Sequence, residues 1–159
     1  MDKQSKDLLI TGGIVALVYF GIINPILKKV GLKKTEEEKA TEEKNKQLLN
    51  KQVEASKKVA AQTKSDQEWK AIADQIYEDL RYSAVSDKKD NAFYQVARVK
   101  NDTDFWILFK YFAKRREYLF GIPSGSLMNL QQFIISNLSK DTIAKINDNY
   151  RRKNIKFRF

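Results

Sequence analysis

The sequence predicts an all-α protein with one N-terminal transmembrane helix, a charged helical spacer and a compact five-helix domain. Three observations lead there. An uncharged run of twenty residues lies near the N-terminus, a polar segment without Gly or Pro spans 35–65, and apolar residues then recur at helical spacing. We divide the chain into a short tail, a membrane span, a basic spacer and a globular domain: 1–7, 8–27, 28–65 and 66–159.

Composition narrows the possible functions. The chain has 159 residues and a formal net charge of +10, with no Cys and no His. Disulfides, Cys/His zinc sites, cysteine nucleophiles and His-based triads are therefore excluded. No phosphate loop, nucleotide fingerprint or metal motif is present, and Glu78, Glu117 and Asp141 are isolated carboxylates. We expect a protein that is not an enzyme and has no cofactor, and whose positive charge favours anionic partners.

The uncharged run, LLITGGIVALVYFGIINPIL, extends from Leu8 to Leu27. At 1.5 Å per residue it spans about 30 Å, the thickness of the hydrocarbon core of a bilayer. The alternatives are a buried core helix, which is rarely this long without a charge, and a cleaved signal peptide, which needs a small-x-small site that does not follow. We expect a retained anchor, with these residues marking the span: Leu8, Ile14, Leu17, Phe20, Ile23 and Leu27.

Lysines on the two sides of this run predict its orientation. Lys3 and Lys6 precede it, whereas Lys28, Lys29, Lys33, Lys34 and Lys39 follow it closely. The positive-inside rule then places the N-terminus outside and the C-terminal domain on the cytoplasmic face. Lys28, Lys29, Lys33 and Lys34 also suit anionic lipid head groups, although an ordinary stop-transfer flank explains them equally well.

The spacer and the first helix of the domain each begin at a capping box. Thr35 with Glu38 predicts the start of a solvated, semi-rigid helix in the spacer. Ser65 with Glu68 predicts a second start. An amphipathic helix follows, with its buried face at Trp69, Ile72, Ala73, Ile76, Tyr77 and Leu80.

Four further helices follow a polar loop at 83–90. The first is short, and the next begins at an Asn101 cap. A tight turn at 120–125 precedes a helix capped by Ser126, and Ser139 caps the last helix, which ends near Arg152. The expected inward residues of these helices are Phe93, Val96, Ala97, Phe105, Leu108, Phe109, Phe112, Leu127, Leu130, Ile134, Leu138, Ile143, Ile146 and Tyr150.

Two residues of the third helix, Trp106 and Tyr111, lie off the apolar stripe and are candidates for a contact surface. Two basic clusters are candidates for contact with a partner protein or with nucleic acid. They are Lys114, Arg115 and Arg116, where the helix dipole alone explains the charge, and the C-terminal tail of Arg151, Arg152, Lys153, Lys156, Phe157, Arg158 and Phe159.

The tail is expected to be extended, with Ile155, Phe157 and Phe159 on one face and Lys156 and Arg158 on the other. Such a segment suits docking on a groove or a sheet edge. Two alternatives stay open: the tail is simply solvated, or it folds back on its own domain.

A family resemblance covers about Trp69 to Phe159. The segments IADQIYEDL, NAFYQVARVKNDTDFWILFKYFAKR and LMNLQQFIISNLSKDTIAKINDNY resemble one five-helix annexin-type repeat. They are also similar to the small single-repeat versions of Bacteroidetes bacteria and their phages. The resemblance implies a fold. Annexin repeats bind calcium through a glycine-rich loop after the first helix, but Ser83 to Asp87 lacks those glycines, which argues against calcium binding.

The sequence thus favours a non-enzymatic, membrane-anchored structural protein. The phage resemblance implies a minor virion protein that links an internal membrane to the capsid shell of a bacteriophage. A membrane tether that binds nucleic acid through its basic domain and tail is the first alternative. A lysis or pore-forming accessory is the second.

Overall fold

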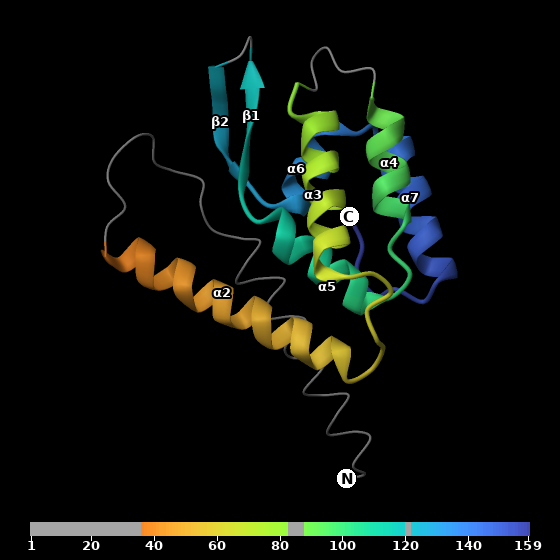
Figure 1. Ribbon diagram of the computed structural model, residues 1–159. Helices are drawn as coiled ribbons and strands as arrows, with labels where there is room; N and C mark the ends of the chain where they lie inside the picture. The colour runs from red at the N-terminus through yellow and green to blue at the C-terminus, as the bar shows by residue number, and fades with distance from the viewer. Residues whose placement is uncertain (1–35, 83–87, 120–121) are drawn as a thin grey trace. The chain divides into compact units, whose positions relative to one another are not determined.

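A computed structural model of the chain describes residues 36–82, 88–119 and 122–159 (Figure 1). It is mostly helical and divides into two compact units, residues 1–58 and 59–159. The predicted membrane span, its flanking lysines and Thr35 lie outside the described residues. Within the described ranges, no helix is both long and apolar enough to cross a bilayer.

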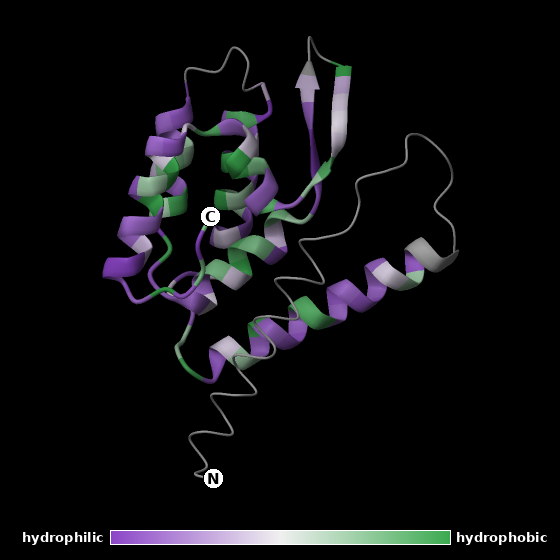
Figure 2. Ribbon diagram, turned by 180° about the vertical axis from the view of Figure 1, so that it is seen from behind, coloured by the Kyte–Doolittle hydropathy of each residue, from purple (hydrophilic) through white to green (hydrophobic). Residues whose placement is uncertain are grey.

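The first unit contains one described helix, α2 (Glu36–Lys57). It occupies most of the predicted spacer, and hydrophilic residues dominate it (Figure 2). An ion pair of 3.2 Å joins Lys57 Nζ to Glu54 Oε1 one turn earlier. The helix ends at Lys57, and residues 58–65 are not helical.

The second unit has the five predicted helices and one addition that was not predicted. The helices are α3 (Asp66–Leu80), α4 (Lys89–Ala97), α5 (Asp102–Phe112), α6 (Leu130–Asn137) and α7 (Lys140–Arg152). Strands β1 (Arg115–Leu119) and β2 (Ile122–Met128) form an antiparallel hairpin between α5 and α6. The fold is therefore mostly, rather than purely, helical.

Three of the predicted helix starts are confirmed by their caps. Ser65 and Glu68 form the reciprocal capping box of α3. The side chain of Asn101 accepts a hydrogen bond from the Asp104 N–H, and that of Ser139 accepts one from the Thr142 N–H. Each side chain satisfies a backbone donor that the first helical turn leaves unpaired. The predicted end of the last helix near Arg152 is also confirmed.

The segment between α5 and α6 corrects the prediction. Residues 122–128 form a strand where a tight turn and a helix starting at Ser126 were expected, and Leu127 is 41% exposed rather than inward. Gly125 has φ +70°, a left-handed value that interrupts any helix there. The true cap is Asn129, which forms a reciprocal capping box with Gln132 that Ser126 lacks.

The core of the second unit is aromatic, and α5 runs through it. Every residue from Thr103 to Phe109 is buried, so α5 is enclosed on nearly all sides rather than along one stripe. Trp106 is only 6% exposed, and the prediction that it lies on a contact surface is wrong. Tyr111 is half-buried, and its hydroxyl donates a 2.7 Å hydrogen bond to Asp66. The remaining fully buried aromatic residues are Trp69, Phe105, Phe112, Phe133 and Tyr150.

The C-terminal tail folds back on this core. Ile155 and Phe157 are buried, and the Phe157 ring stacks on Phe105 with 3.9 Å between centroids. The Asn147 side chain holds the Phe159 backbone at both its N–H (2.9 Å) and its carbonyl (3.0 Å). The apolar face of the tail is thus used within its own domain, as one of the two alternatives for the tail proposed.

A candidate anion-binding hollow

Of the predicted basic cluster at 114–116, the middle residue is engaged internally. Arg115 Nη2 lies 2.6 Å from Asp74 Oδ1, and the guanidinium lies 4.9 Å from the ring centroids of Tyr77 and Phe112. Burial by itself raises the pKa of Asp74, but hydrogen bonds from Lys70 and Arg115 outweigh it and leave that pKa below its usual value. Lys114 and Arg116 are exposed.

Some basic side chains of the C-terminal tail are likewise engaged within the domain, and others are exposed. Arg151 pairs with Asp148 at 2.6 Å on the surface, and the Arg158 guanidinium donates to the backbone carbonyls of Ile155 and Phe157. Arg152 and Lys156 are exposed, whereas Lys153 is half-buried and donates a hydrogen bond to the Ala97 carbonyl. Lys153 leads to a site that the sequence analysis did not identify.

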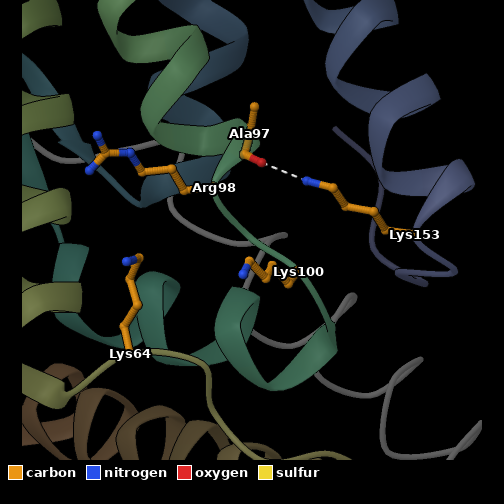
Figure 3. A pocket seen from close by; sticks show the side chains of 5 residues that line it. All are labelled: Lys64, Ala97, Arg98, Lys100 and Lys153. Carbon is orange, nitrogen blue, oxygen red and sulfur yellow. Dashed lines mark hydrogen bonds between the residues drawn. The ribbon is translucent and has the colours of Figure 1, made fainter.

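That site is an open hollow of about 510 Å³, lined by Lys64, Ala97, Arg98, Lys100 and Lys153 (Figure 3). Figure 3 shows Lys64 rising toward the turn that carries Arg98 and Lys100, while Lys153 reaches across from α7. The lining comes from four helix ends: the residue before the α3 cap, the end of α4, the residue before the α5 cap and the C-cap of α7. Among the described lining residues, four are basic and none is acidic.

A buried carboxylate organises one side of the hollow. Asp104 is fully buried and accepts hydrogen bonds from the backbone N–H (2.8 Å) and the hydroxyl (2.8 Å) of Thr63, and from the Lys100 N–H (3.1 Å). Thr103 and Asn101 add bonds to the carbonyls of Ala60 (2.7 Å) and Ala61 (3.0 Å). These bonds hold residues 60–63 against the start of α5, and so fix the backbone on both sides of Lys64 and at Lys100.

Lys153 closes the opposite side. Its ammonium donates to the carbonyls of Ala97 (2.6 Å) and Val99 (2.9 Å), which compensates the negative end of the α4 dipole. Burial, followed by repulsion from Lys100 and Arg152, lowers the pKa of Lys153, while Asp104 acts in the opposite direction. An ammonium has three hydrogens, so one remains after these two bonds.

The other three cations are loosely held. Lys64 Nζ lies 3.8 Å from Glu68 Oε1, a long contact at the surface. Among the residues that the structure describes, the side chains of Arg98 and Lys100 have no hydrogen-bond or ion-pair partner, and both residues are exposed. Positively charged donors without internal partners, gathered around a concavity, are suited to an oxyanion such as phosphate.

No group of three or more acidic or other metal-ligating side chains gathers in the described part of the chain to hold a metal ion. The hollow itself offers donors only, without a nucleophile paired to a base. Binding of an anion is the chemistry that this arrangement supports.

Only Lys153 of the hollow was among the predicted contact residues. Lys64, Arg98 and Lys100 were missed because none of them belongs to a run of adjacent cations; Val99 separates Arg98 from Lys100. One signal was available: Lys64 and Lys100 directly precede Ser65 and Asn101, the two caps that the sequence identifies.

Comparisons with known proteins found no match: no family model, no curated protein and no solved structure is similar to this chain. The resemblance to an annexin-type repeat therefore stays a prediction. The loop at 83–87, on which its calcium argument depends, lies outside the described residues.

Proposed function

We propose that the chain is a non-enzymatic membrane tether whose C-terminal unit, residues 59–159, binds nucleic acid through the phosphate backbone. The observation that carries this proposal is the basic hollow, in which the side chains of Arg98 and Lys100 have no hydrogen-bond or ion-pair partner in the described residues. Exposed cations at Arg152 and Lys156 on the adjoining tail add to it. The uncharged run at 8–27 supplies the proposed anchor.

The arrangement favours recognition of phosphate over recognition of bases. The cations of the hollow and the exposed Arg152 and Lys156 of the tail can neutralise different phosphates of one polyanion, which supplies sequence-independent affinity. Base stacking needs exposed aromatic rings. Phe105, Trp106 and Phe157 are buried, and Tyr94 on α4 is the exposed ring among the described aromatic residues; stacking on such a ring tolerates every base. We therefore expect binding with little sequence preference and a steep dependence on salt.

The salt dependence of binding tests this proposal. The full chain in a mild detergent is titrated into labelled single-stranded and double-stranded oligonucleotides over a series of salt concentrations. The logarithm of the association constant should fall linearly with the logarithm of the salt concentration. In the double variant Arg98→Gln/Lys100→Gln, the slope should decrease by about two, since each lost phosphate contact removes about one unit.

A matched control removes two charges elsewhere. Lys140 and Lys145 are exposed residues on α7, outside the lining of the hollow. The variant Lys140→Gln/Lys145→Gln has the same net charge as the hollow variant, and its slope should stay closer to that of the wild type. Absence of binding by the wild type at low salt removes the proposal.

The link between an internal membrane and a capsid shell, which the sequence analysis favoured, stays a prediction. Fractionation of the native source distinguishes it from a cellular tether. Co-purification with virions supports the link to a shell, whereas a chain that stays with cell membranes supports the tether. For the lysis accessory the expected mark is toxicity on expression, and harmless accumulation in the membrane counts against it.

A further inference from the structure

We propose that the hollow is a site for a terminal phosphate, and that the domain therefore binds the 5′-phosphorylated end of a nucleic-acid strand more tightly than its interior. This inference rests on the proposed function and deepens it, because it names the group that the site recognises. The observation that carries it is the gathering of four cations around one concavity, where a groove or a stripe would suit a continuous backbone.

The shape of the site suits the end of a strand. Residues at four helix ends line the hollow, and Lys153 reaches from α7 to the end of α4 (Figure 3). An internal phosphate has the strand continuing on both sides, whereas a terminal phosphate needs only one exit. The volume of about 510 Å³ lies within the range of roughly 300–1,000 Å³ that is typical of small-ligand sites. One nucleotide end therefore fits this space.

The charge of the site suits a phosphomonoester. A phosphodiester carries a single negative charge, but a phosphomonoester carries about −1.5 to −2 at neutral pH and presents three strong acceptor oxygens. The fork of Arg98 can engage two oxygens, and Lys64 and Lys100 can each donate to an oxygen. The remaining hydrogen of Lys153 is a further donor. A dianion matches this set of donors better than a monoanion does.

The closeness of the cations to one another also favours a dianion as the ligand. Lys153 is held in place by two carbonyls although Lys100 and Arg152 repel it. The Lys100 backbone is fixed through Asp104. The folded domain thus holds like charges together without a ligand, and a dianion among them relieves that repulsion. Part of the ordering that binding requires is therefore already present in the fold.

Two carboxylates near the hollow would repel an anion, and both accept hydrogen bonds from neighbouring residues. One carboxylate oxygen of Glu68 accepts hydrogen bonds from the Ser65 N–H and hydroxyl. The other oxygen lies 3.8 Å from Lys64 Nζ. Asp104 accepts three hydrogen bonds from Thr63 and Lys100 and is fully buried. Neither belongs to the lining of the hollow. The four cations of the lining outnumber these two carboxylates.

The test compares two oligonucleotides that differ only at the 5′ end. The full chain in mild detergent is titrated with the same labelled single strand carrying a 5′-phosphate or a 5′-hydroxyl. The phosphorylated strand should bind about tenfold more tightly, the effect of one additional charge-assisted hydrogen bond. Arg98→Gln and Lys100→Gln should each bring this ratio close to one, while Lys140→Gln should leave it unchanged.

The outcomes separate this inference from the proposed function. If both strands bind with equal affinity, the terminal-phosphate site is wrong and backbone binding stands. If neither strand binds at low salt, both proposals fail. Detergent micelles doped with phosphatidic acid supply the same phosphomonoester from a lipid. If they displace the labelled strand at much lower concentration than adenosine monophosphate does, the site belongs to a lipid head group and the assignment to strand ends is overturned.

Discussion

The C-terminal tail and the hollow are both basic, but their charges are placed very differently. In the tail, five cations are near neighbours in sequence, and several are engaged internally: Arg151 with Asp148, Lys153 and Arg158 with backbone carbonyls. In the hollow, the cations come from three separate segments, and the side chains of Arg98 and Lys100 lack partners in the described structure. A charge cluster that is conspicuous in the sequence can thus serve the fold, while cations from separate segments gather around one hollow.

The largest effect is expected from removing the tail. Deleting residues 154–159 takes away Ile155 and Phe157, both buried, and exposes the face of Phe105 on which Phe157 stacks. Loss of a buried Phe alone costs about 3–5 kcal/mol, so the deletion should remove most of the stability of a domain of this size. Thermal unfolding measures this.

A point variant separates the apolar and basic faces of the tail. Lys156→Gln changes an exposed side chain, and its melting temperature should stay close to that of the wild type. If instead the deletion leaves the melting temperature unchanged, the tail is a contact segment and not part of the core.

The next effect concerns the core beneath the tail. Phe105→Ala should destabilise the domain by about 3–5 kcal/mol, because the ring is fully buried and contacts several other aromatic rings. In a double-mutant cycle with Phe157→Ala, the two rings should show a coupling of about 0.5–1.5 kcal/mol beyond the area they bury. Additive effects would mean that the stacked pair does not form.

Asp104→Asn tests the carboxylate that holds residues 60–63 to α5. The amide keeps one acceptor but places an N–H₂ group where the carboxylate accepts hydrogen bonds from Thr63 or Lys100. A cost of about 1–3 kcal/mol is expected for a buried group that loses a partner. Hydrogen exchange at the Thr63 amide should accelerate more than at Phe109. Equal acceleration at both amides would indicate global rather than local loosening.

Much of the fold follows from local signals in the sequence. Ser65, Asn101 and Ser139 predict three helix starts because capping depends only on the first turn of each helix. The hairpin was missed because its pairing, with Glu117 opposite Ser124, depends on a register that no local pattern displays. Trp106 was misplaced because α5 is enclosed by neighbours on nearly all sides, and a stripe describes only a helix with one buried face.

The hollow was not predictable for a different reason. It requires the end of α7 to lie next to the end of α4 and the starts of α3 and α5, and only the tertiary packing determines this. The signals that sequence analysis used were runs of charge, which favour the tail and the cluster at 114–116. In the structure, Arg115 of that cluster is committed to Asp74 and two rings.

A smaller effect on stability should distinguish a cation with internal partners, Arg115, from one without them in the described structure, Arg98. Arg98→Gln should change the free energy of unfolding by less than about 0.5 kcal/mol, since its guanidinium makes no hydrogen bond or ion pair in the described structure. Arg115→Gln should cost about 1–3 kcal/mol, because it removes the charge-assisted hydrogen bond to Asp74, which keeps only Lys70, and the hydrogen bond to the Phe112 carbonyl. Chemical denaturation of the two variants checks this. Similar losses in both would mean that Arg98 is structural and that the hollow is not a free binding surface.

The smallest effects are expected at Glu68, which lies next to Lys64 of the hollow. Its substitution should change both the pH dependence of stability and the affinity for a phosphorylated strand. The Ser65 backbone N–H and hydroxyl, which donate to this carboxylate, hold its pKa below the usual 4.5. A carboxyl with a lowered pKa in the folded state stabilises above the unfolded pKa, and this contribution is lost as the pH falls below 4.5 through the folded value. Wild-type stability should therefore fall more between pH 7 and pH 3 than that of Glu68→Gln, whose amide still reaches back to the Ser65 N–H.

The same substitution should act in the opposite direction on binding. Glu68→Gln removes the counter-charge that lies 3.8 Å from Lys64, so at pH 7 the affinity for a phosphorylated strand should rise. The rise should be small, because water and salt screen an ion pair this exposed. Titration at constant salt measures it, with Lys64→Gln as the reference that lowers affinity. If Glu68→Gln leaves the affinity unchanged while Lys64→Gln weakens it, Lys64 already turns away from Glu68 toward the hollow. If neither matters, Lys64 does not contribute to the anion site, and the hollow depends on Arg98, Lys100 and Lys153 alone.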